Sequence, residues 1–89
     1  MEFIHSRECL EANDIVEIDC DTQCNIMLTT DAEFAAFKNN RDCNHYGGFF
    51  KYFPVRLAPP GAGNWNITID VGEGYSANIR YSINIIRQR

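Results

Sequence analysis

The chain has 89 residues, of which 45% are hydrophobic and 22% are charged. This length predicts one domain, residues 1–89, with one core, and the composition excludes a disordered chain. No apolar run approaches the roughly 20 residues of a membrane helix. The first residues also lack the basic and apolar regions of a signal peptide. We therefore expect a cytoplasmic protein without membrane contact, in which the four cysteines are thiols.

Charge is distributed unevenly along the chain. Residues 1–37 carry nine acidic side chains against Arg7 alone, whereas residues 38–89 carry three acidic and seven basic ones. Acidic and basic strands can pair within the domain, or a bipolar domain can associate with copies of itself. A homo-oligomer therefore stays open. Nucleic acid is not expected as a partner, because phosphate binding needs a basic surface and the net charge is −4.

Turn residues divide the first half of the chain into short elements. We expect an edge strand at residues 3–4, strands at 15–20 and 24–29, and a turn at 21–23 between them; residues 6–10 are ambiguous. Thr30 and Glu33 have the spacing of a capping box, and Phe34 and Phe37 follow as an apolar stripe. This pattern predicts one short helix over residues 31–39.

Glycine and proline mark the elements of the second half. A break at residues 46–48 precedes an expected strand at 49–57, in which Pro54 favours an edge position or a bulge. Residues 59–63 form a loop. Apolar and polar residues then alternate over 64–71 and again over 77–86, with a Gly-rich interruption between them. Such alternation predicts an antiparallel hairpin with one face in the core and one in water.

Together the elements predict an all-β fold: a small antiparallel β-sandwich, jelly-roll-like, with one short helix. The expected core joins the apolar row of the hairpin to side chains that cover it. Its members are Trp65, Ile67, Ile69, Ile79, Tyr81 and Ile83, covered by Val16, Ile18, Leu28, Phe34 and Phe37.

The polar row of the same hairpin is the candidate ligand-binding surface. If Val71 pairs with Ala77, Asp70 and Arg80 become diagonal neighbours on one face. Asparagine is disfavoured in strands, so a row rich in it is consistent with recognition of a sugar, a nucleotide-like metabolite or a polar protein surface. A merely solvated outer face is the alternative. The candidate residues are Asn64, Asn66, Thr68, Asp70, Asn78, Arg80 and Ser82, with Tyr46 as an aromatic at the rim.

The cysteines are weak candidates for chemistry. Cys20, Cys24, Cys43 and His45 offer three sulfurs and an imidazole, but their spacing is not that of a zinc site. Cys20 and Cys24 would lie opposite each other if residues 21–23 are a hairpin loop, which leaves a disulfide open. Cys43 with His45 could be read as nucleophile and base, although no orienting group is identifiable. We expect buried thiols, no metal and no cofactor.

Several motifs resemble a known bacterial family at matching intervals along nearly the whole chain. They are the runs at residues 3–8, 20–25, 46–48, 53–55, 65–70 and 78–83. The chain resembles the family of domain of unknown function 1883. This resemblance implies a compact β-sandwich that occurs alone or beside a Toll/interleukin-receptor-type domain, and it supplies no catalytic residues.

These observations favour a non-catalytic binding or adaptor module that recognises a polar small molecule or a protein partner. The family resemblance alone points to bacterial defence or stress signalling. A structural homo-oligomer and a small metal- or thiol-dependent enzyme are the alternatives.

Overall fold

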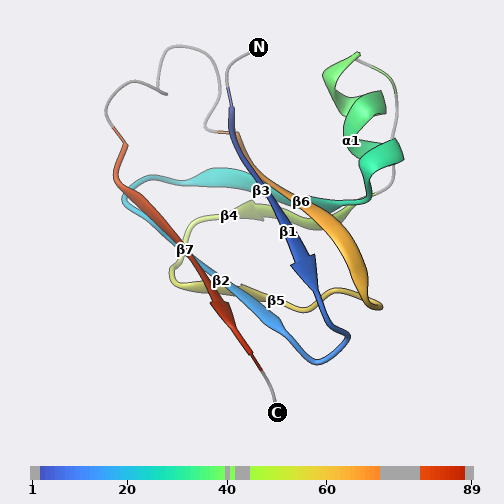
Figure 1. The fold of residues 1–89 in the computed structure, drawn as a ribbon. Helices are drawn as coiled ribbons and strands as arrows, with labels where there is room; N and C mark the ends of the chain where they lie inside the picture. Colours follow the sequence, from blue (N-terminus) through green and yellow to red (C-terminus); the bar gives the residue numbers. More distant parts are fainter. Residues whose placement is uncertain (1–2, 40, 42–44, 71–78, 88–89) are drawn as a thin grey trace.

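The computed structural model describes residues 3–39, 41, 45–70 and 79–87 (Figure 1). Seven strands and one helix lie in these ranges. In chain order they are β1 (Ile4–Leu10), β2 (Ile15–Cys20), β3 (Cys24–Thr29), α1 (Asp31–Lys38), β4 (Tyr46–Phe50), β5 (Val55–Leu57), β6 (Gly63–Asp70) and β7 (Tyr81–Ile86).

The strands form two antiparallel sheets, one with the order β1-β6-β3-β4 and the other with the order β5-β2-β7. The predicted all-β sandwich with one short helix is thereby confirmed. In Figure 1, α1 lies on the side of the first sheet that faces away from β2, β5 and β7. The helix therefore covers part of the outer face of the first sheet, over β6 and β3.

The predicted hairpin between residues 64–71 and 77–86 is wrong. β6 pairs with β1 and β3, whereas β7 pairs with β2 in the other sheet. Alternation determines which side chains share a face of a strand, but it carries no information about the neighbouring strand. The expected pair of Val71 with Ala77 lies outside the described residues.

Apolar side chains fill the space between the sheets. Trp65, Ile67 and Ile69 on β6 are buried there, as predicted, together with Val16, Ile18 and Leu28. Ile79 and Ile83 are only partly buried against this core. Tyr81 was expected in the core, but it is 49% exposed. It lies on β7, an edge strand that has a neighbouring strand, β2, on one side only among the described residues.

The helix begins and ends as its capping residues predict. Thr30 Oγ1 accepts a hydrogen bond from the Glu33 backbone N–H at 3.2 Å, and Glu33 Oε1 accepts one from the Thr30 N–H at 2.8 Å. Asn39 closes the other end. This helix of only two turns depends on docking for its stability.

Aromatic rings dock the helix on the outer face of the first sheet. The rings of Phe34 and His5 stack with centroids 4.0 Å apart, and the Phe3 ring meets Phe34 and Phe37 edge-on. Phe34 and Phe37 therefore do not cover the core between the sheets, as expected from the sequence, but form a second apolar cluster under α1.

Three segments differ in extent from the expectation. The first strand continues through the ambiguous residues to Leu10. The expected strand at 49–57 is divided, because β4 ends at Phe50 and β5 begins after Pro54 in the other sheet. Gly47 and Gly48 are part of β4 rather than a break before it. β5 is an edge strand, as Pro54 indicated.

Candidate functional site

The structure separates the candidate residues into different regions of the domain. Asn64, Asn66, Thr68 and Asp70 belong to β6, whereas Arg80 precedes β7 and Ser82 lies within β7, in the other sheet. Asn78 lies outside the described residues. Tyr46 on β4 packs edge-on against Trp65, with ring centroids 6.2 Å apart. The single polar face that the alternation predicted is therefore wrong.

The middle of the β6 part of the row, Asn66 and Thr68, is buried rather than in water. Asn66 is 1% exposed, and Thr68 is equally buried. Asn64 is exposed, and Asp70 is half-buried. A ligand cannot reach Asn66 or Thr68 in this arrangement, so two of the candidate residues are not available for recognition.

Asn66 instead joins three segments by hydrogen bonds. Its Oδ1 accepts from His5 Nε2 at 2.7 Å, and its Nδ2 donates to Asp31 Oδ1 at 2.8 Å and to the Thr29 carbonyl at 3.4 Å. Because Nδ2 donates to two oxygens, Oδ1 must accept, and His5 carries a proton on Nε2. Asn66 thus connects β1, β6 and the first residue of α1.

Arg7 completes this network at the surface. Its Nε and Nη2 donate to the two carboxylate oxygens of Asp31 at 2.9 and 2.7 Å. The hydrogen bonds from Arg7 and Asn66 hold the pKa of Asp31 well below its usual range. The sequence offers no local signal for this network, because the residues that bond to each other are 24 to 61 positions apart.

The cysteine candidates do not form a reactive centre in the described part of the chain. Cys20 and Cys24 are free buried thiols, and Cys9 is a free exposed one; Cys43 lies outside the described residues. The expected hairpin pairing of Cys20 with Cys24 is wrong, because β2 and β3 belong to different sheets. Burial, and then the neighbouring Cys20, raise the pKa of the Cys24 thiol to about 12.

No group of three or more histidine, cysteine, aspartate or glutamate side chains in the described ranges is placed to hold a metal ion. The same ranges contain no helix with the length and apolar character needed to span a bilayer.

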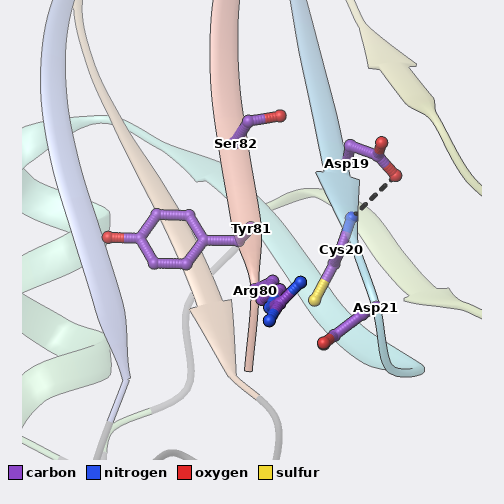
Figure 2. A pocket seen from close by; sticks show the side chains of 6 residues that line it. All are labelled: Asp19, Cys20, Asp21, Arg80, Tyr81 and Ser82. Atoms are coloured by element: carbon purple, nitrogen blue, oxygen red, sulfur yellow. Dashed lines mark hydrogen bonds between the residues drawn. The ribbon is translucent and has the colours of Figure 1, made fainter. Parts of the chain in front are cut away.

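A pocket of about 290 Å³ lies at the adjacent ends of β2 and β7. Figure 2 shows the side chains of Cys20, Asp21 and Arg80 pointing toward one another there. Apart from Cys20, the lining residues are exposed, so the pocket is open to solvent. Six residues line it, namely Asp19, Cys20, Asp21, Arg80, Tyr81 and Ser82.

Strand pairing positions the lining residues. Cys20 is the register partner of Tyr81, and Asp19 is the partner of Ser82. The Asp21 backbone N–H donates to the Arg80 carbonyl at 3.0 Å and so extends the pairing beyond the strand ends. Asp19 Oδ1 accepts from the Cys20 N–H at 3.0 Å (Figure 2). The backbone around the pocket is therefore held in place without Arg80's side chain.

Charge in the pocket is mixed. No carboxylate oxygen in the described ranges lies within ion-pairing distance of the Arg80 guanidinium, although Asp19 and Asp21 line the same pocket. The pocket thus presents guanidinium donors and carboxylate acceptors to one ligand. Sequence reasoning identified Arg80 and Ser82 but missed Asp19 and Asp21, whose position at a strand end before a turn was an available signal.

Fold and site define a small β-sandwich domain with a polar surface pocket and a helix on its outer face. The chain matches the family described as domain of unknown function (DUF1883) over residues 1–89, and it belongs to this family. No curated protein and no solved structure matches the chain significantly.

Proposed function

We propose that this domain is a non-catalytic binding module for a polar small molecule, which it takes in the pocket at the ends of β2 and β7. The observation that supports this proposal most directly is the guanidinium of Arg80, which has no ion-pair partner among the described residues although two carboxylates line the same pocket. An arginine that lacks an internal partner at a pocket can donate to an anionic or hydroxyl group of a ligand.

The dimensions and chemistry of the pocket restrict the ligand. A volume of about 290 Å³ is at the lower end of small-molecule sites, so the ligand is the size of an amino acid or a monosaccharide. Arg80 meets its acidic or hydroxyl group, and Asp19 and Asp21 accept from its ammonium or hydroxyl groups. Tyr81 supplies an aromatic surface at the rim.

Binding without catalysis agrees with the state of the Cys24 thiol, which neighbours the pocket residue Cys20. Thiol catalysis needs a lowered thiol pKa, whereas the pKa of Cys24 is raised to about 12. A ligand-binding or adaptor role in the cytoplasm is part of this proposal. The proposed role in bacterial defence or stress signalling rests on the family resemblance alone. In such a role the ligand-bound domain would act on a protein partner.

The test is isothermal titration calorimetry with a defined panel of amino acids, monosaccharides and nucleoside monophosphates. We expect at least one probe to bind, and we expect Arg80→Ala to abolish that binding. Arg56→Ala is the matched control: it removes an exposed arginine from the same sheet, but one that already pairs with Glu17 at 2.9 Å. Absence of binding across the panel, or binding that survives Arg80→Ala, contradicts the proposal.

A further inference from the structure

Open strand edges expose backbone donors and acceptors that can pair with another chain. In the described part of the structure the outermost strands are β1 and β4 in one sheet and β5 and β7 in the other. Proteins protect such edges with charged side chains, with proline or with very short strands. The four edges differ in how far they are protected.

Three of the edges carry such protection. β1 contains Arg7 and Glu8. β5 is only three residues long and contains Arg56. β7 has an arginine directly before it and another directly after it, Arg80 and Arg87.

β4 has the least of this protection, because Lys51, directly after it, is the one arginine or lysine that adjoins the strand. Its five residues, Tyr46 to Phe50, include no charged side chain. Phe49 is 52% exposed and Tyr46 is 48% exposed, so the strand presents aromatic surface to solvent. Gly47 leaves a gap between them, and its φ of +120° together with the close Ile26 carbonyl oxygen excludes a larger residue there.

We propose that β4 pairs antiparallel with β4 of a second copy of this chain, about a two-fold axis at Gly48. Phe49 of each copy then lies opposite Gly47 of the other, and Tyr46 lies opposite Phe50. The aromatic ring covers the position that has no side chain. The two four-stranded sheets become one continuous sheet.

The charged side chains at the strand edges favour β4 over β1 and β7 for pairing with itself. In a two-fold interface each side chain meets residues of an identical strand, so a charged edge opposes like charges. Self-pairing of β7 about its centre brings Arg80 of one copy opposite Arg87 of the other, and self-pairing of β1 about its centre brings two copies of Arg7 together. An axis at Gly48 instead places Lys51 of one copy opposite His45 of the other, so no two arginine or lysine side chains face each other across the β4 pair.

The size of the contact sets its strength. A five-residue strand contributes a small interface compared with the roughly 1,200 Å² or more of stable complexes, so the dimer forms only at high protein concentration. Aromatic contacts and backbone pairing change little with salt, whereas association driven by the bipolar charge weakens as salt is added.

Sedimentation velocity over a range of concentrations tests the proposal with two matched variants. Phe49→Lys places a like charge on each side of the axis, and we expect it to weaken dimerisation about tenfold or more. Tyr52→Lys is the control, because it also exchanges an exposed aromatic, 88% exposed, for a lysine, but outside β4. We expect it to dimerise as the parent does, in low and high salt alike.

Hydrogen exchange of the parent protein provides a second measurement that requires no variant. We expect the β4 amides to gain protection as concentration rises, while the amides of β7 do not. A parent protein that stays monomeric at millimolar concentration overturns the proposal. Equal dimerisation of Phe49→Lys and Tyr52→Lys does so as well, as does protection gained at β7 instead of β4.

Discussion

Asn66 of β6 donates a hydrogen bond to Asp31, the first residue of α1, at a distance of 2.8 Å. This contact connects the helix to the centre of the first sheet. It also changes the meaning of the polar row on β6. A buried amide with three hydrogen-bond partners organises the fold, and the pocket that Arg80 lines is therefore the site we propose for a ligand.

Replacing Asn66 tests this structural role. We expect Asn66→Ala to lower the free energy of unfolding by about 1 to 3 kcal/mol, because it removes the three hydrogen bonds of a buried amide, including the one to the carbonyl of the buried Thr29. Asn64→Ala is the matched control on the same face of β6; since Asn64 is exposed, its loss should cost about 0.5 kcal/mol or less. Urea denaturation measures both changes, and equal stability of the two variants would contradict the assignment.

The contact between Asp31 and Arg7 predicts a dependence of stability on pH. The pKa of Asp31 is lowered from its ordinary value of 3.8, so its contribution is complete above that pH and is lost as pH falls through the lower pKa of the folded state. We expect the stability difference between the parent and Asp31→Asn to be larger at pH 7 than at about pH 2.

Urea midpoints at the two pH values check this expectation. Arg7→Ala should reduce the pH dependence that Asp31 contributes, because hydrogen bonding to Arg7 is the main cause of the lowered pKa. A difference between parent and Asp31→Asn that is unchanged at low pH would refute the prediction.

Trp65 tests the core between the sheets. Its side chain is buried, and its Nε1–H donates to the Gly61 carbonyl at 3.0 Å. We expect Trp65→Ala to cost about 3 to 5 kcal/mol, enough to unfold a domain of this size. Trp65→Phe retains most of the apolar volume and should lose much less. Thermal melting distinguishes them; a Trp65→Ala protein that melts within a degree or two of the parent would place this ring outside the core.

Thiol labelling tests the state of the cysteines. The unfolded chain should react with four equivalents of iodoacetamide, one for each cysteine. In the folded protein we expect Cys9, which is exposed, to react before the buried Cys20 and Cys24. The high pKa of Cys24 slows its reaction further, because the thiolate is the nucleophile. Fewer than four equivalents in the unfolded chain, restored by a reductant, would reveal a disulfide.

Local patterns in the sequence predicted the core face of β6 and the start of the helix. Alternation placed Trp65, Ile67 and Ile69 in the core, and the spacing of Thr30 and Glu33 placed the start of the helix. Both depend on residues a few positions apart, so the sequence expresses them directly.

Strand partners and the pocket could not be obtained in the same way. The pairing of β6 with β1 and β3, and the cover that α1 provides over Asn66, depend on segments far apart in the chain. The same holds for the pocket, in which Asp19 meets Ser82 only because β2 pairs with β7. Arg80 and Ser82 were therefore assigned to a surface that does not exist, although both line a pocket.

The position of β6 between β1 and β3 also has a consequence for synthesis on the ribosome. β1 has its only strand partner among the described residues in β6, and His5 pairs with Thr68. The first sheet therefore cannot form completely until residue 70 has left the exit tunnel. Until then β1 and β3 both lack β6, their shared neighbour. Pairing over such distances slows folding, so we expect this domain to complete its fold only after nearly its entire chain has been translated.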